Sequence, residues 1–61
     1  MQDKIWVSKD GRRWLVANME TRHIVNCIRM IQRSMARGRP WRVDYYDRLQ
    51  LELEIRNIQN R

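Results

Sequence analysis

Between Thr21 and Arg37 the chain alternates apolar and polar residues with the period of an α-helix. At about 100° per residue, four arginines and one asparagine fall within an arc of roughly 80°. We call this set the arginine face, and it consists of Arg22, Asn26, Arg29, Arg33 and Arg37. Four apolar residues fall within about 60° on the opposite side, with Cys27 at their edge: Ile24, Ile28, Ile31 and Met35. The pattern predicts a helix with one buried side and one side that meets water or an anionic partner.

Two short runs rich in Trp, Val and Ile precede this helix, at Lys4–Ser8 and Arg12–Ala17. Lys9-Asp10-Gly11 lies between them. Asp-Gly between two such runs is typical of a hairpin, because Gly accepts the positive φ of tight turns. We predict a β-hairpin in which Trp6 and Trp14 pair across the strands. A two-stranded hairpin is barely stable alone, so its apolar face must pack on helices.

The residues around the first helix indicate where it begins and ends. Asn18, Glu20 and Thr21 are all candidates for its N-cap, and a glutamate there also favours the positive end of the helix. Gly38 after a basic last turn is a common stop signal. A short loop follows, with Pro40 as a candidate for the opening of the next helix.

The last segment, Val43 to Asn60, fits two structures. Apolar and polar residues alternate between Leu49 and Arg56, which is strand periodicity. The segment is nevertheless rich in helix formers and has no internal Gly or Pro, so we predict a helix. That helix has two apolar faces: Tyr45, Tyr46, Leu49 and Leu53 on one side, and Val43, Leu51, Ile55 and Ile58 on the other. Either the hairpin or a second copy of the chain covers the second face.

Together these patterns predict a small α+β protein of ββαα order, with an N-terminal hairpin packed on an antiparallel helix pair. Its single domain of 61 residues comprises a hairpin at about 4–17, a helix at about 21–37 and a helix at about 42–59. So short a chain buries only about 60% of its unfolded surface and usually needs a disulfide, a metal or a partner. The single cysteine excludes an internal disulfide. We therefore predict a homodimer formed through Leu51, Ile55 and Ile58, with Trp41.

The basic residues are distributed unevenly along the chain. The net charge is +6, and eleven of the thirteen basic residues are Arg. Residues 1–43 hold ten basic and three acidic residues (+7), and residues 44–61 hold three basic and four acidic residues (−1). Such a basic surface suits an acidic protein, a nucleic acid or a membrane surface, and it also suits a purely solvating role.

The arginine face is the strongest candidate site. Arg29, Arg33 and Arg37 follow one another at every fourth position, and Arg39, Trp41 and Arg42 extend the same basic region. Like charges at this spacing repel mildly, which favours selection for binding. We predict that this face binds another protein, because arginine is enriched in protein interfaces. A nucleic acid is the alternative, although the face lacks lysines and no nucleic-acid motif accompanies it.

No residues are spaced for catalysis. His23 is the only imidazole and has no Ser, Cys or carboxylate placed to form a triad with it, so we expect it to be partly buried and bonded to backbone or to Glu20. Cys27 has the character of a small core residue. One His and one Cys cannot make an ordinary zinc site. We predict no enzyme activity, no cofactor and no metal.

Aromatic and charged residues cluster at the start of the last helix. Trp41, Arg42, Tyr45 and Tyr46 form an aromatic–basic group that can stack nucleic-acid bases, but we favour packing onto the core. Asp44 and Asp47 charge the first turn of the helix. The chain has no apolar run long enough to span a bilayer and its N-terminus lacks the apolar core of a signal peptide, so we predict a cytoplasmic protein.

Two segments, Trp6-Val-Ser-Lys-Asp-Gly-Arg12 and Met19-x-x-x-His23-Ile-x-Asn26-x-Ile28-Arg-Met-Ile31, resemble small uncharacterised phage and prophage proteins. In those proteins a Trp-containing strand leads into an Asp-Gly-Arg turn, and a Met and a His-Leu-x-Asn helix start follow. The resemblance covers roughly residues 6–55. This chain has Ile24 where that pattern has Leu, and Glu20-Thr21 where its cap is usually Thr or Asp. The resemblance implies a hairpin–helix–helix accessory protein encoded by a phage. In that setting the expected partner is a host or viral protein, and the chain would be an inhibitor or modulator of a host or defence factor in the bacterial cytoplasm. A virion structural or assembly component is the third alternative, after a nucleic-acid-binding protein. It brings no catalytic residues.

Overall fold

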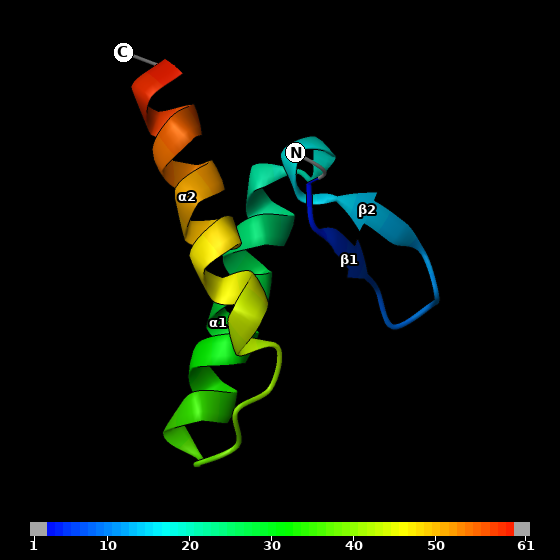
Figure 1. The fold of residues 1–61 in the computed structure, drawn as a ribbon, viewed down its shortest axis with the longest axis vertical. Coiled ribbons are helices and arrows are strands. Elements are labelled where there is room, and N and C mark those ends of the chain that lie inside the picture. The colour runs from blue at the N-terminus through cyan, green and yellow to red at the C-terminus, as the bar shows by residue number, and fades with distance from the viewer. Residues whose placement is uncertain (1–2, 60–61) are drawn as a thin grey trace.

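The computed structural model describes residues 3–59 and contains a hairpin followed by two packed helices (Figure 1). The elements, in chain order, are strands β1 (Ile5–Val7) and β2 (Arg13–Leu15), the 3₁₀ helix η1 (Val16–Asn18), and helices α1 (Thr21–Ala36) and α2 (Val43–Gln59). The helices run antiparallel, with the hairpin beside them (Figure 1). The predicted small α+β fold is confirmed, and the alternating residues of the last segment lie in a helix.

The hairpin has the predicted register and turn. Trp6 pairs with Trp14 across the antiparallel strands. Gly11 has a φ of +87° and its N–H donates to the Ser8 carbonyl at 2.9 Å, which is the backbone geometry that favours glycine at this position. Trp6 is buried, whereas its strand neighbours Ile5 and Val7 are exposed. The hairpin therefore contributes one large side chain to the core.

A short 3₁₀ helix, η1, joins the hairpin to α1 and was not predicted. It places Val16 and Met19 in the core. Glu20 is the N-cap of α1, one of the three candidates, but its side chain makes no capping hydrogen bond. The buried apolar residues come from the hairpin, η1 and both helices: Trp6, Val16, Met19, Ile24, Cys27, Ile28, Ile31 and Leu49.

The predicted apolar side of α1 is confirmed for Ile24, Ile28 and Ile31, which are buried. Cys27, expected at its edge, is completely buried. Met35, expected inside, is 40% exposed, because the last turn of α1 extends beyond the start of α2 and has only the connecting loop beside it (Figure 1). The buried side therefore includes Cys27 and ends at Ile31.

Gly38 ends α1 as predicted. It has a φ of +77°, its N–H donates to the Met35 carbonyl, and the Arg39 N–H donates to the Ser34 carbonyl, both at 2.9 Å. These are the two bonds of a Schellman motif. The expectation that Pro40 opens the next helix is wrong: Pro40 lies in the loop and α2 begins at Val43. Arg42, just before it, holds an unusual backbone φ of +52°.

Helix α2 packs on α1 and the hairpin through the first of its two predicted apolar faces. Leu49 is buried, and Tyr45, Tyr46 and Leu53 pack against the core. The Tyr45 hydroxyl donates to the Ile5 carbonyl at 2.9 Å, which ties α2 to β1. Neither helix in residues 3–59 is long and apolar enough to cross a membrane.

Candidate interaction surface

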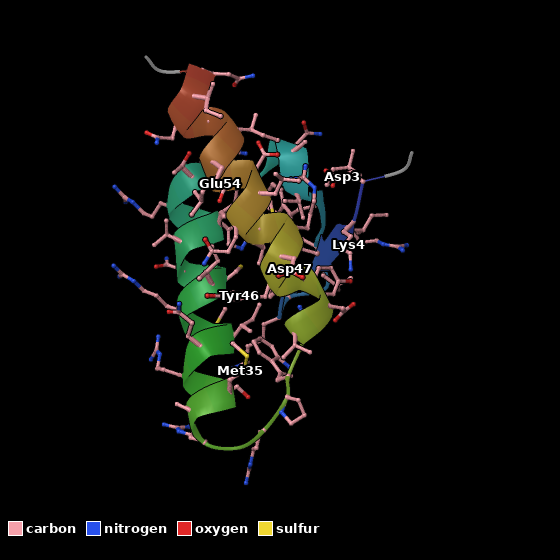
Figure 2. The ribbon with its side chains drawn as sticks, turned by 60° about the vertical axis from the view of Figure 1, so that its left-hand side comes forward. Asp3, Lys4, Met35, Tyr46, Asp47 and Glu54 are labelled. Carbon is pink, nitrogen blue, oxygen red and sulfur yellow. The ribbon has the colours of Figure 1, made fainter. Side chains whose placement is uncertain are left out.

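All five residues of the arginine face are exposed on the side of α1 that faces away from the core. A row of nitrogen-tipped side chains projects there from the edge of α1 that faces away from α2 (Figure 2). Among the described residues, none of these arginines forms an ion pair or donates a side-chain hydrogen bond. The reason is local: residues 21–36 contain no Asp or Glu. The exposed position that the sequence predicts for the arginine face is therefore confirmed.

The two arginines of α2 are used quite differently. Arg48 donates to Asp3 at 2.7 Å and to Glu52 at 2.8 Å, and Arg56 donates to Glu52 at 2.9 Å. Arg56 also donates to the Thr21 hydroxyl at 2.9 Å, so this ion-pair network joins α2 to the N-terminal segment and to the start of α1. Glu52, the buried acid at its centre, was not recognised from the sequence.

The network sets the protonation of its acids. Burial by itself raises the pKa of Asp3 and of Glu52, but their hydrogen bonds outweigh it and hold both pKa values below the usual 3.8 and 4.5. Asp3 accepts from Arg48 and from the Ala17 and Lys4 backbone N–H groups, and Glu52 accepts from Arg48 and Arg56. Both acids are therefore committed inside the fold and do not neutralise the arginine face.

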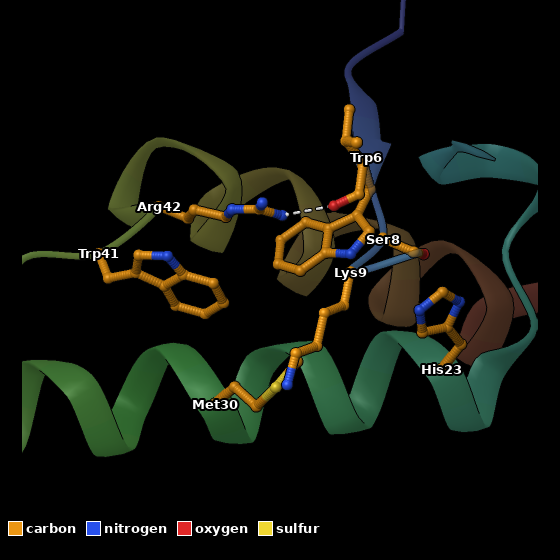
Figure 3. A pocket seen from close by; sticks show the side chains of 8 residues that line it. Trp6, Ser8, Lys9, His23, Met30, Trp41 and Arg42 are labelled. Atoms are coloured by element: carbon orange, nitrogen blue, oxygen red, sulfur yellow. Dashed lines mark hydrogen bonds between the residues drawn. The ribbon is translucent and has the colours of Figure 1, made fainter. Parts of the chain in front are cut away.

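Arg42 forms a clamp over two indole rings. Its guanidinium carbon lies 4.5 Å from the centroid of the Trp6 ring and 5.0 Å from that of Trp41, within cation–π distance. Its Nη1 donates to the Val7 carbonyl at 2.9 Å (Figure 3). Trp6 and Trp41 meet edge to face at 6.0 Å. Arg42, expected as a further partner contact, is thus engaged internally, and it fixes the position of Trp41.

Beside this clamp an open groove of about 370 Å³ lies between the hairpin, the loop before α2 and one edge of α1. We call it the aromatic groove. Trp6, Trp41, Met30 and His23 supply its aromatic and apolar lining, and Lys9 and Arg42 supply its charged groups (Figure 3). Met30 is separated by one helical turn from Asn26 and from Arg33, so the groove borders directly on the arginine face.

The groove was missed at the level of sequence, because its walls come from three segments far apart in the chain. One local signal existed: Met30 is an apolar residue outside the apolar arc of α1, next to the arginines. Trp41, which we predict to take part in self-association, forms a wall of the groove and is 38% exposed. Its part in self-association stays a prediction.

The residues with reactive side chains, His23 and Cys27, have structural roles. The His23 ring contacts the Trp14 ring edge to face at 5.8 Å rather than bonding to Glu20. Burial raises the pKa of the Cys27 thiol to about 11, which keeps it protonated and unreactive at neutral pH. Within residues 3–59, no group of three or more His, Cys, Asp and Glu residues is arranged to hold a metal ion.

No other element within residues 3–59 covers the second apolar face of α2. Leu51 is 49% exposed and Ile58 is 67% exposed, with Val43 and Ile55 also exposed. The last turns of α2 run past the beginning of α1 (Figure 1). Asp47 and Glu54 lie along the same helix (Figure 2), and both are exposed. The hairpin does not cover this face, so self-association through Leu51, Ile55 and Ile58 stays a prediction.

Comparison of the chain with protein-family models, with curated proteins and with solved structures gives no match. Its function must therefore be inferred from its own residues.

Proposed function

We propose that this chain is a non-enzymatic interaction protein whose arginine face binds an acidic surface of another protein. The phage-encoded accessory proteins that it resembles supply the expected setting, in which the partner is a host or viral protein. One observation carries the proposal: four exposed arginines line one side of α1 without a carboxylate partner among the described residues, although both described arginines of α2 form ion pairs.

The spacing of the arginines suits a row of carboxylates. Arg22 and Arg37 are fifteen positions apart, which corresponds to about 22 Å along a helix. The planar guanidinium binds a carboxylate through two parallel hydrogen bonds. Unpaired like charges at every fourth position cost a little helix stability, and a partner that supplies carboxylates removes that cost.

A protein partner is favoured over a nucleic acid by the surroundings of the face. The aromatic groove beside it is mostly apolar, and an apolar centre with a charged border is the usual anatomy of a protein interface. A nucleic-acid surface is expected to be more uniformly cationic, whereas α1 contains no lysine. Nucleic acid remains the second candidate because evenly spaced arginines also match phosphates.

The test compares two double variants that lose the same charge. Arg29→Gln with Arg33→Gln removes the centre of the arginine face, and Arg12→Gln with Arg13→Gln removes two exposed arginines of the hairpin. We expect the first pair to weaken binding of a short Asp/Glu-rich peptide about tenfold and the second pair to weaken it much less. Titration calorimetry or fluorescence anisotropy measures both.

Two results contradict the proposal. Equal losses in the two double variants mean that only net charge matters. Tighter binding of duplex DNA than of the peptide near physiological salt, with a slope of log affinity against log salt that falls by about one unit per lost arginine, assigns the face to nucleic acid.

A further inference from the structure

The aromatic groove has the size and lining of a site for one large apolar side chain. Its volume of about 370 Å³ falls within the range of roughly 300–1,000 Å³ that is usual for ligand sites. The indoles of Trp6 and Trp41 and the thioether of Met30 line it. Methionine adapts its shape to varied apolar partners, and Met30 is 40% exposed at the groove. The lining therefore favours an apolar occupant.

The charges around the groove restrict what accompanies that side chain. Lys9 reaches from the hairpin toward Met30 across the groove, and Arg42 lies over the Trp41 ring (Figure 3). No Asp or Glu of residues 3–59 lines the groove, and the arginine face runs along its α1 side. An occupant that enters here meets positive charge on both flanks, so its neighbouring residues must be acidic.

The backbone at Arg42 helps to fix one wall of the groove. A non-glycine residue with a φ of +52° is strained, and such strain is concentrated at functional positions. The Arg42 guanidinium lies over the Trp6 and Trp41 rings and donates to the Val7 carbonyl. These contacts fix the position of the Trp41 indole at the groove.

We infer that the aromatic groove receives a single large apolar side chain, such as Leu or Phe, from an acidic segment of the partner protein, while the flanking carboxylates of that segment bind the arginine face and Lys9. This inference rests on the proposed function and specifies which kind of partner segment the surface selects. Such buried anchors surrounded by polar contacts supply most of the affinity of protein interfaces.

A nucleobase fits the groove less well. Reading a base requires donors and acceptors aimed at its edge, and the Ser8 hydroxyl in the lining already accepts from the Trp14 indole N–H at 2.9 Å. The Trp6 and Trp41 rings already meet each other edge to face at 6.0 Å, so a base cannot enter between them.

The test uses two synthetic peptides that differ at one position: a run of Asp and Glu with Leu at its centre, and the same run with Ser at its centre. We expect the wild-type chain to bind the Leu peptide about tenfold more tightly than the Ser peptide, because burying a leucine side chain in the groove removes apolar surface from water. In NMR spectra the Leu peptide alone is expected to shift the Met30 methyl and the Trp41 indole N–H signals.

Three variants of the chain test whether the preference for the Leu peptide arises in the aromatic groove. Met30→Ala and Trp41→Ala are expected to reduce the preference for the Leu peptide to about twofold or less. Met30 is exposed and contributes little to the core, so Met30→Ala stays informative even if Trp41→Ala unfolds. Leu51→Ala is the matched control, because Leu51 is equally exposed but lies on the far side of α2, and the tenfold preference should survive it.

The outcomes separate this inference from the proposed function. Equal affinity for the Leu and Ser peptides, with a loss of both in Arg29→Gln/Arg33→Gln, overturns the anchor while leaving the arginine face as a binding site. No dependence of either peptide on Arg29 and Arg33 overturns both. Binding of single-stranded DNA that shifts the Trp41 indole signal more than the Leu peptide does also overturns the anchor.

Discussion

The arginines of the two neighbouring helices differ in exposure and in their partners. Arg48 and Arg56 of α2 retain only 20% of their side-chain exposure and are bonded to Asp3 and Glu52. The arginines of α1 are exposed and have no acidic partner within residues 3–59. The side chains are identical, so the difference comes from their neighbours. In α2 a glutamate lies four positions from each arginine, and in α1 every such position holds an uncharged or basic residue.

This difference indicates that the arginines of α2 stabilise the fold, whereas those of α1 are free to bind a partner. An arginine between two carboxylates that are themselves mostly buried stabilises the fold, and removing it leaves buried charges unpaired. An exposed arginine without a partner contributes little to stability, so its value must lie in what it meets outside the chain. The ion-pair network and the arginine face can therefore be separated by mutation.

Removing the centre of the network is expected to have the largest effect. Arg48→Ala removes the ion-pair partner of Asp3 and leaves Glu52 with Arg56 alone, and these two acids are only 16% and 9% exposed. The change should lower the free energy of unfolding by about 3 kcal/mol. Urea denaturation measures this. Arg29→Ala on the arginine face is the control, with an expected change within about 0.5 kcal/mol. Similar losses in both variants would erase the distinction between the two sets.

Lowering the pH is expected to break the same ion pairs in the wild-type chain, because it protonates the two acids. Because Asp3 and Glu52 have folded pKa values below the usual 3.8 and 4.5, their ionisation stabilises the fold fully above about pH 5. That contribution is lost as the pH falls through the lowered folded values. The urea midpoint should stay nearly constant from about pH 7 to 5 and fall below about pH 4. Glu52→Gln should start lower and fall less steeply; an identical profile in this variant would argue against the network.

Arg42 belongs to neither set, because it is engaged by indole rings instead of carboxylates. Its strained backbone predicts that Arg42→Gly is more stable than Arg42→Ala by about 1 kcal/mol, since glycine tolerates the positive φ and both variants lose the clamp. Comparative urea denaturation measures the difference. Equal stability of the two variants would mean that the backbone relaxes and stores no strain there.

The outer face of α2 gives the smallest expected effect on the fold. Leu51 is half exposed, so Leu51→Glu should change the free energy of unfolding of the isolated chain by less than about 0.5 kcal/mol. If two copies associate through Leu51, Ile55 and Ile58, sedimentation at micromolar concentration should give twice the 7.6 kDa chain mass for the wild type, and Leu51→Glu should halve it. A wild-type mass of one chain would contradict the predicted homodimer.

Local signals in the sequence were enough for the hairpin, both helices and the exposed position of the arginine face. Asp10-Gly11, Gly38 and the period of the apolar residues act through neighbours in the chain, so their consequences can be read without a structure. Met35 and Pro40 were misplaced because the ends of helices depend on which element lies beside them.

The contacts that build the aromatic groove, and those that tie the ion-pair network to the N-terminal segment, are long-range. Arg48 meets Asp3 from 45 positions away, and Arg42 reaches Val7 from 35 positions away. The walls of the aromatic groove likewise come from the hairpin, α1 and the loop before α2. No periodicity within one segment encodes such pairs, which is why the Arg48–Asp3 pair and the groove became visible only in three dimensions.

The most direct test of the central claim follows the arginine Nε–H signals of the wild-type chain by NMR while a short Asp/Glu-rich peptide is added. This single titration compares both sets of arginines in one molecule. We predict that the signals of Arg22, Arg29, Arg33 and Arg37 shift together with one affinity, while those of Arg48 and Arg56 stay in place. Equal shifts at Arg12 and Arg13 of the hairpin, or no shifts on α1, would contradict the assignment of the arginine face as the binding surface.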